Sequence, residues 1–151
     1  MDRSLAVRNS NVGRLMFNSA RKFEETIHDF VQQAGFCDVR FVHLTLTRNM
    51  DYDGTRLTDL AARAGMTKQA MSELVDECEE IRIVERRADP TDRRARMIVF
   101  TSRGRKLMRA LMAGIAHAET EMAAAVGARA MKEIAAALRI YGAGGEQRMI
   151  A

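Results

Sequence analysis

The sequence predicts a mainly α-helical protein that contains one small β-hairpin. The chain is alanine-rich, and long stretches near both of its ends carry apolar residues at spacings of three and four, which is the period of a helix. Between them, two short β-branched runs flank a turn that contains Pro90, the only proline of the chain. The 151 residues are 47% hydrophobic and 29% charged, enough apolar surface for one compact core with helical extensions.

The N-terminal third is predicted to form one long helix that ends at Gly35. A second helical run is expected over residues 39–49, and Asp51, Tyr52, Asp53 and Gly54 predict a turn after it. One face of the long helix is apolar: Val12, Met16, Ala20, Phe23, Ile27, Phe30 and Ala34.

Residues 57–80 predict two short helices at a sharp angle. Such a pair needs a small residue where the helices cross and a glycine in the turn, and Ala61 and Gly65 supply them. Thr67 is a good N-cap for the second helix, which is expected to end near Glu80. The buried face predicted for the second helix consists of Ala70, Met71, Leu74, Val75 and Cys78.

A β-hairpin is predicted directly after these helices, with strands over 83–87 and 96–100 and a turn over 88–92. Between Arg82 and Arg96 lie six arginines and three acidic residues, so this segment carries +3 of the net charge of +4. Arginine makes forked contacts with phosphates and base edges, although a solvated basic surface explains the charge equally well.

Thr101 or Ser102 is expected to cap another long helix, which Gly127 interrupts. A final helix is predicted from Arg129 to Tyr141, followed by a frayed tail. The apolar stripes of these outer helices need a partner, and a second copy of the chain is the simplest one. We therefore expect a homodimer, with a dimerisation helix over 1–35, a DNA-binding region over 36–104 and dimerisation helices over 105–151.

This order of elements predicts a winged helix-turn-helix core flanked by long dimerisation helices. Residues 57–108 resemble the core of the MarR family of bacterial regulators. The resemblance is carried by the LA-x-x-x-G-x-[ST] helix-turn-helix, the VERR strand, the D-P-x-D-R-R turn and the T-x-x-G that opens the next helix. It implies a dimeric transcriptional regulator, usually a repressor, which binds double-stranded DNA at a palindromic operator and is released by a small effector, often a phenolic or aromatic acid.

The second helix is expected to enter the major groove and the hairpin to contact the neighbouring minor groove. The resemblance further implies that Asp92 orients an arginine, that Arg94 enters the minor groove, and that Arg93 and Arg96 contact phosphates. The family usually has glycine where this chain has Arg82, so the end of the second helix is expected to differ. The complete set of DNA-binding candidates is Thr67, Lys68, Gln69, Ser72, Glu73, Arg86, Arg87, Asp92, Arg93, Arg94 and Arg96.

Two sensing alternatives stay open beside an organic effector. Glu24, Cys37, His43 and His117 could together bind zinc, although no histidine pair has a tight ligand spacing and no metal or cofactor is predicted. Cys37, ahead of a helix N-terminus, could instead sense oxidants. The candidates for binding an anionic organic ligand are Arg14, Arg21 and Arg40 together with Phe17, Phe41 and His43.

Other classes of protein find less support in the sequence. The N-terminus lacks the apolar core of a signal peptide and no stretch is long enough to span a bilayer, so a cytoplasmic location is expected. Two distant cysteines predict no disulfide framework, and no catalytic motif is present. One rival is a winged-helix module that binds a protein instead of DNA. It is favoured by Arg82 and by acidic residues of the second helix: Glu73, Asp76, Glu77, Glu79 and Glu80.

Overall fold

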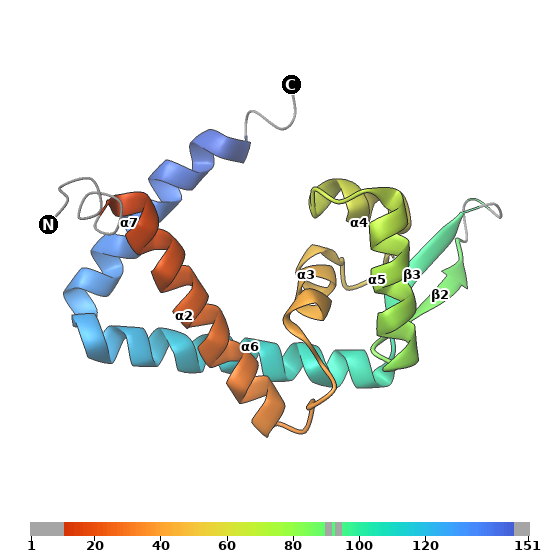
Figure 1. Cartoon of the computed structure of the whole chain (residues 1–151), viewed down its shortest axis with the longest axis horizontal. Helices are drawn as coiled ribbons and strands as arrows, with labels where there is room; N and C mark the ends of the chain where they lie inside the picture. Colours follow the sequence, from red (N-terminus) through yellow and green to blue (C-terminus); the bar gives the residue numbers. More distant parts are fainter. Residues whose placement is uncertain (1–10, 90–91, 93–94, 147–151) are drawn as a thin grey trace, which may run out of the picture. The chain divides into compact units, whose positions relative to one another are not determined.

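The structure, a computed structural model, describes residues 11–89, 92 and 95–146, and for residues 143–146 the backbone alone (Figure 1). The described chain forms two compact units. One unit comprises residues 27–114. The other is formed by residues 11–26 and 115–146, so that the long helices α2 (Val12–Gln33) and α6 (Ser102–Val126) each contribute to both.

The unit of residues 27–114 contains the predicted helix-turn-helix and hairpin, and the mainly helical fold with a winged-helix core is confirmed. Along the chain, this unit begins with the end of α2 and finishes with the start of α6. The elements between them are α3 (Phe41–Asn49), β1 (Thr55–Arg56), α4 (Leu57–Arg63), α5 (Lys68–Glu80), β2 (Val84–Ala88) and β3 (Arg96–Phe100).

The sheet has three antiparallel strands in the order β1-β3-β2, where the sequence predicted only two. Strand β3 pairs with β2 from Val84↔Phe100 to Ala88↔Arg96, and with β1 through Thr55↔Ile98 and Arg56↔Met97. Gly54 makes the close approach of β1 possible. A Cβ at this residue would lie 2.7 Å from the Val99 side chain, and its φ of 103° is a conformation that side chains rarely adopt.

The core of this unit lies where α4, α5 and the sheet pack together with α3 and the start of α6. The helical period predicts its α5 face well, because Met71, Leu74, Val75 and Cys78 are all buried while Ala70 is half-buried. Burial raises the pKa of the Cys78 thiol to about 12, so this cysteine stays protonated and inert. The largest fully buried apolar side chains include Leu44, Leu46, Leu60, Met71, Ile83, Ile98 and Leu107.

Helix α5 ends in a left-handed turn at Arg82, whose φ is 59°. The Arg82 N–H donates to the Glu79 carbonyl at 2.9 Å and the Ile83 N–H to the Cys78 carbonyl at 3.0 Å, the paired bonds of a Schellman motif. The expectation that arginine here would change the helix end is wrong. Two hydrogen bonds and the burial of Ile83 hold the backbone in the conformation that glycine adopts more readily.

The other unit is helical in its described residues except at Asn11 and Gly127. Gly127, with a φ of 87°, separates α6 from α7 (Ala128–Glu146). The prediction placed the end of the last helix at Tyr141 and a frayed tail after it. This is wrong up to Glu146, because α7 continues through three glycines. None of the helices in the described part of the chain has both the length and the hydrophobicity of a membrane span.

Candidate nucleic-acid interface

The turn between α4 and α5 presents the first two turns of α5 to solvent. Gly65 has a φ of 63°, and the Met66 N–H donates to the Ala61 carbonyl at 2.9 Å, which fixes the turn. Thr67 caps α5 as predicted, because its hydroxyl oxygen accepts from the Ala70 N–H at 3.1 Å. Ser72 is half-buried, and the other side chains of the outward face are exposed: Lys68, Gln69, Glu73 and Asp76.

Arg86 of β2 binds the carboxylates of α5 and does not point freely to solvent. Its Nη1 lies 2.7 Å from Asp76 Oδ1 and also pairs with Glu79, whose other oxygen accepts from the Arg86 N–H at 2.7 Å. Its Nη2 donates to the Ser72 carbonyl at 3.3 Å. This arginine, a predicted DNA contact, therefore joins α5 to the hairpin.

Glu77 is held from the other side of α5 by α3. His43 is buried, and its Nδ1 accepts from the Arg40 N–H at 3.1 Å, so Nε2 carries the proton and donates to Glu77 Oε2 at 3.2 Å. Arg40 forms an ion pair with the same oxygen. The hydrogen bond from His43, followed by the charge of Arg40, holds the pKa of Glu77 below its usual range.

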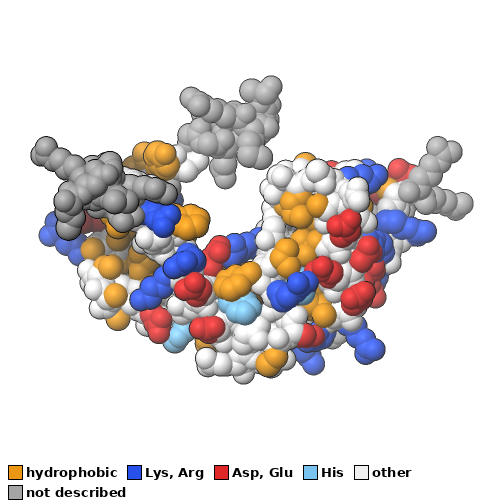
Figure 2. All heavy atoms as spheres, in the orientation of Figure 1, with side chains coloured by type: hydrophobic (Ala, Val, Ile, Leu, Met, Phe, Trp, Pro, Cys, Tyr) orange, Lys and Arg blue, Asp and Glu red, His pale blue; other side chains and the backbone are white. Residues whose placement is uncertain are grey.

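These contacts compensate part of the negative charge on α5. Of its five carboxylates, Asp76, Glu77 and Glu79 have a basic partner, while Glu73 and Glu80 pair with no cation of the described residues. Acidic and basic side chains are accordingly interspersed over this unit in Figure 2. Arg86 and Arg40 thus offset two of the five negative charges of α5, which lowers the electrostatic obstacle to a phosphate backbone without removing it.

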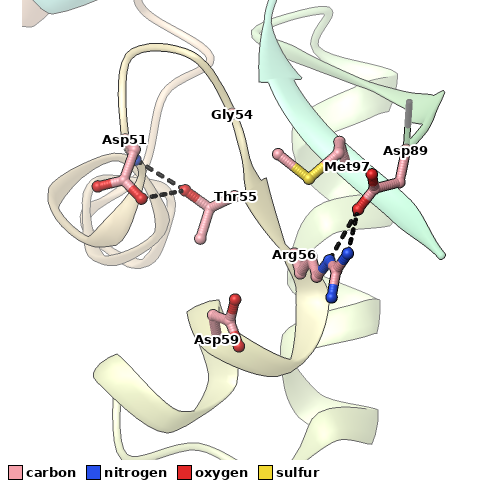
Figure 3. Close-up of a pocket in the computed structure, with 7 residues that line it drawn as sticks. All are labelled: Asp51, Gly54, Thr55, Arg56, Asp59, Asp89 and Met97. Carbon is pink, nitrogen blue, oxygen red and sulfur yellow. Dashed lines mark hydrogen bonds and ion pairs between the residues drawn. The ribbon is translucent and has the colours of Figure 1, made fainter. Parts of the chain in front are cut away.

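The hairpin loop is anchored at its base by a buried carboxylate. The side chain of Asp89 is 4% exposed, and Arg56 of β1 contacts its Oδ2 through Nε and Nη2, each at 2.7 Å. The Asp92 N–H reaches the other oxygen of Asp89 at 3.3 Å. Figure 3 shows this pair at the edge of a shallow pocket of about 350 Å³, which Asp51, Asp59 and Met97 also line.

The arginines of the hairpin fall into three groups. Arg87 is exposed and pairs with Glu85 two residues away, and Arg96 is exposed at the start of β3. Both are accessible to a DNA backbone, whereas Arg86 is held by α5. Arg93 and Arg94 lie outside the described residues. The phosphate and minor-groove contacts that the resemblance implies for them therefore stay predictions.

The six candidates for ligand binding are divided between the two units. Arg14, Phe17 and Arg21 lie on the exposed N-terminal part of α2, where the Arg14 guanidinium sits 5.9 Å from the Phe17 ring centre and Arg21 pairs with Glu25. In the other unit, Arg40 and His43 meet at Glu77. Phe41 stacks on His28 with 4.2 Å between ring centres.

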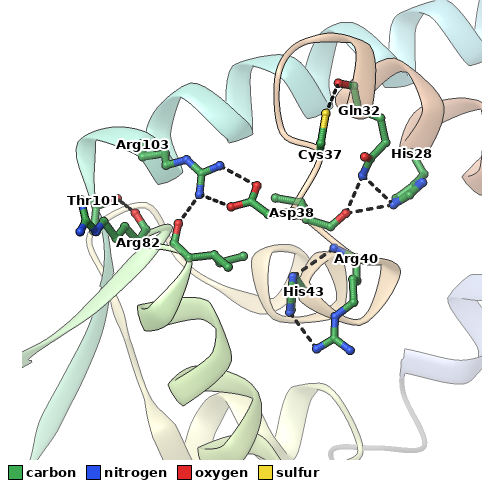
Figure 4. A network of polar contacts seen from close by, with 11 residues as sticks. His28, Gln32, Cys37, Asp38, Arg40, His43, Arg82, Thr101 and Arg103 are labelled. Carbon is green, nitrogen blue, oxygen red and sulfur yellow. Dashed lines mark hydrogen bonds and ion pairs between the residues drawn. The ribbon is translucent and has the colours of Figure 1, made fainter.

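The link between α2 and α3 is a polar network that sequence reasoning missed (Figure 4). His28 and Gln32 both reach the Val39 carbonyl, at 3.0 and 2.7 Å. Arg103 of α6 holds Asp38 with two hydrogen bonds of 2.9 and 2.6 Å, contacts that lower the pKa of Asp38. Since Asp38 and Arg103 are 65 positions apart, no local pattern could have paired them.

The residues considered for zinc binding do not form a site in the described part of the chain, where no group of three or more possible ligands comes together. Cys37 is exposed and its thiol donates to the Gln32 carbonyl at 3.6 Å. His43 is engaged by Glu77, and His117 lies near Glu121 on α6.

Comparison with known proteins agrees with this geometry. Residues 48–95, which include α4, α5 and β2, match the model of the MarR family. This segment of the winged-helix region is therefore similar to the MarR family. A search of curated protein sequences finds no significant match.

Several solved structures share the fold beyond the segment that matches the family model. RV1404 from Mycobacterium tuberculosis is 18% identical, with a TM-score of 0.73 and 97% of each chain covered. CouR from Rhodococcus jostii RHA1, bound to p-coumaroyl-CoA, is 22% identical with a TM-score of 0.67, over 87% of this chain and 91% of that one. The MarR family protein RV2887 from M. tuberculosis, in complex with p-aminosalicylic acid, is 21% identical with a TM-score of 0.64, over 88% and 99%. At these identities the likeness establishes the fold alone.

Proposed function

We propose that this protein is a dimeric, sequence-specific DNA-binding regulator of transcription that acts as a repressor in the cytoplasm. The recognition helix α5 would read the major groove, and the arginine-bearing hairpin would contact the minor groove and its phosphates. The observation that carries the proposal is the exposure and the charge of the side chains on α5. Its N-terminal face presents exposed hydrogen-bonding side chains, while Arg86 and Arg40 form ion pairs with carboxylates behind this face and His43 donates a hydrogen bond to Glu77.

A second copy of the chain is the proposed partner of the helical unit. A single copy leaves large apolar side chains of α2 and α7 exposed, among them Phe17 at 61%, Ile140 at 80% and Tyr141 at 79%. Exposed apolar surface of this kind marks an interaction site. A dimer would also place two recognition helices on one duplex, with half-sites about one helical turn apart, roughly 10 bp.

We propose that an aromatic carboxylic acid or its thioester releases the repressor from DNA. The support is the pair of relatives of the same fold that hold p-coumaroyl-CoA and p-aminosalicylic acid. In this chain, Arg14, Arg21 and Arg40 offer cations, and Phe17, Phe41 and His43 offer rings or a polar partner for such a ligand.

Selection of bound duplexes from a random pool, at two salt concentrations, tests the DNA-binding proposal. A repressor enriches a palindrome whose affinity falls steeply with salt, because bound cations release counterions from the phosphates. Arg94→Ala should weaken binding to this palindrome. Arg109→Ala is the matched control, since Arg109 is exposed on α6 and makes no ion pair with a described residue. A folded dimer that enriches no sequence would instead support the protein-binding module.

A further inference from the structure

The exposed pair formed by Gln69 and Glu73 on α5 is unlike the other polar groups of this helix. Gln69 Nε2 donates to Glu73 Oε1 at 3.2 Å, one helical turn away. A carboxylate only accepts hydrogen bonds, so the amide nitrogen of Gln69, and not its oxygen, must face Glu73. The contact orients the Glu73 carboxylate and leaves its Oε2 and the Gln69 amide oxygen available as acceptors.

Glu73 is an acidic residue in the part of α5 that is proposed to approach DNA. A carboxylate there opposes the binding of the negatively charged phosphates. Asp76 and Glu79, on the following turn, are held by Arg86. Glu73 has no basic partner among the described residues and lies within the first two turns of α5, the part of a recognition helix that contacts base edges. An uncompensated acid there weakens binding to every duplex, and it is useful only if it favours one base over the others.

Hydrogen-bond chemistry selects that base. In the major groove guanine presents two acceptors and thymine presents one, and both repel a carboxylate. Adenine has a donor, but the N7 acceptor beside it faces the same group. Cytosine offers its N4 amino group without an adjacent acceptor, and Glu and Asp recognise it in this way.

We propose that Glu73 reads a cytosine through its N4 amino group at one position of each half-site, with Gln69 as the positioning residue. This inference rests on the proposed function and deepens it. Glu73 accepts from the base through Oε2, and Gln69 fixes the carboxylate through Oε1. The negative charge of Glu73 also lowers affinity for duplexes that lack this cytosine. Specificity therefore comes both from attraction to the correct base and from repulsion by the others.

The test repeats the duplex selection with Glu73→Gln, Gln69→Ala and Glu80→Gln. Glu80 is the matched control, because it is an exposed acid at the far end of the same helix and pairs with no cation of the described residues. We expect the wild type to prefer cytosine over thymine by on the order of 10-fold at one symmetric position. Glu73→Gln should abolish this preference and shift it toward adenine, which glutamine recognises. Gln69→Ala should reduce the preference for cytosine without changing the base, and Glu80→Gln should leave it unchanged.

Three results would overturn the inference. Retention of the wild-type base preferences by Glu73→Gln would exclude a role in readout. The same change of preference in Glu80→Gln would mean that helix charge alone is responsible. If the wild type enriches no sequence, the proposed function itself fails and the inference fails with it, an outcome distinguishable from the first two because these require a wild-type operator.

Discussion

Gly104 in the first turn of α6 packs directly against the carbonyl group of Ile83. A Cβ at Gly104 would lie 1.9 Å from the Ile83 oxygen, closer than any real contact. The same carbonyl accepts from the Thr101 N–H at 3.2 Å, and the Thr101 hydroxyl oxygen accepts from the Gly104 N–H at 3.0 Å. The T-x-x-G pattern therefore has a structural cause: it caps α6 and joins this helix closely to the segment that leaves α5.

Gly104→Ala should destabilise the protein by about 2–3 kcal/mol, because the Ile83 backbone must move to admit a methyl group. Urea unfolding followed by circular dichroism measures this change. The matched control is Gly142→Ala on α7, where a Cβ would meet no atom within 4 Å. Since alanine favours a helix over glycine, this variant should be neutral or more stable by up to about 1 kcal/mol. Equal stability of the two variants would contradict the close packing.

Arg82→Gly should stabilise the protein by roughly 0.5–1 kcal/mol. Arg82 is held at a φ of 59°, where a side chain clashes with its own backbone and glycine does not. The gain is reduced because glycine also gives the unfolded chain more freedom. Arg82→Ala removes the charge but keeps the strained backbone, so its free energy of unfolding should stay near that of the wild type. A destabilised Arg82→Gly would show that the arginine side chain, and not the turn, matters for stability.

The elements found from the sequence are those that carry a strong local signal. The apolar period of α5, the Thr67 cap and the β-branched run of β3 each depend on residues close together in the chain. Strand β1 has only two residues, and its pairing with β3 depends on the missing side chain of Gly54. The expectation for the end of α5 failed for a different reason. At Arg82, tertiary contacts hold a backbone conformation that this residue type disfavours.

The candidate site was predictable as a surface but not as a set of contacts. The period of α5 correctly separates its buried residues from exposed ones such as Lys68 and Gln69. Sequence reasoning could not show that Arg86 turns back onto Asp76 and Glu79, because this depends on how the hairpin packs against the helix. The ion pair of Asp89 with Arg56 was missed for the same reason, since the two residues are 33 positions apart.

The Asp38–Arg103 ion pair should make stability depend on pH in the acid range. Hydrogen bonding to Arg103 lowers the pKa of Asp38 in the folded protein, below the value of about 3.9 expected for the unfolded chain. Its stabilisation is therefore complete above pH 4–5 or so and is lost as the pH falls through the folded pKa. Asp38→Asn should reduce the free energy of unfolding at neutral pH and flatten its decrease in acid.

Urea titrations at a series of pH values measure this effect. Asp53→Asn is the control, because Asp53 is exposed and forms no ion pair with a described residue. Its curve should run parallel to that of the wild type. If Asp38→Asn also runs parallel, the ion pair contributes nothing to the pH dependence.

Arg86 and Arg87 are neighbours with the same side chain, and the structure gives them different roles. Arg86 is half-buried and joins β2 to Asp76 and Glu79 of α5, whereas Arg87 is exposed and, among the described residues, pairs with Glu85. Arg86→Ala leaves those two carboxylates without their cation, so it should lower the free energy of unfolding by roughly 1–2 kcal/mol. Arg87→Ala should leave stability within about 0.5 kcal/mol of the wild type.

Binding to the selected operator separates the two roles further. If Arg87 contacts a phosphate, its removal should reduce the slope of log affinity against log salt by about 1. Arg86→Ala should weaken binding with little change in this slope, because the angle between α5 and the hairpin is no longer fixed. Arg86 would be a phosphate contact, and not a link between α5 and β2, if its replacement changed the salt slope but not the stability.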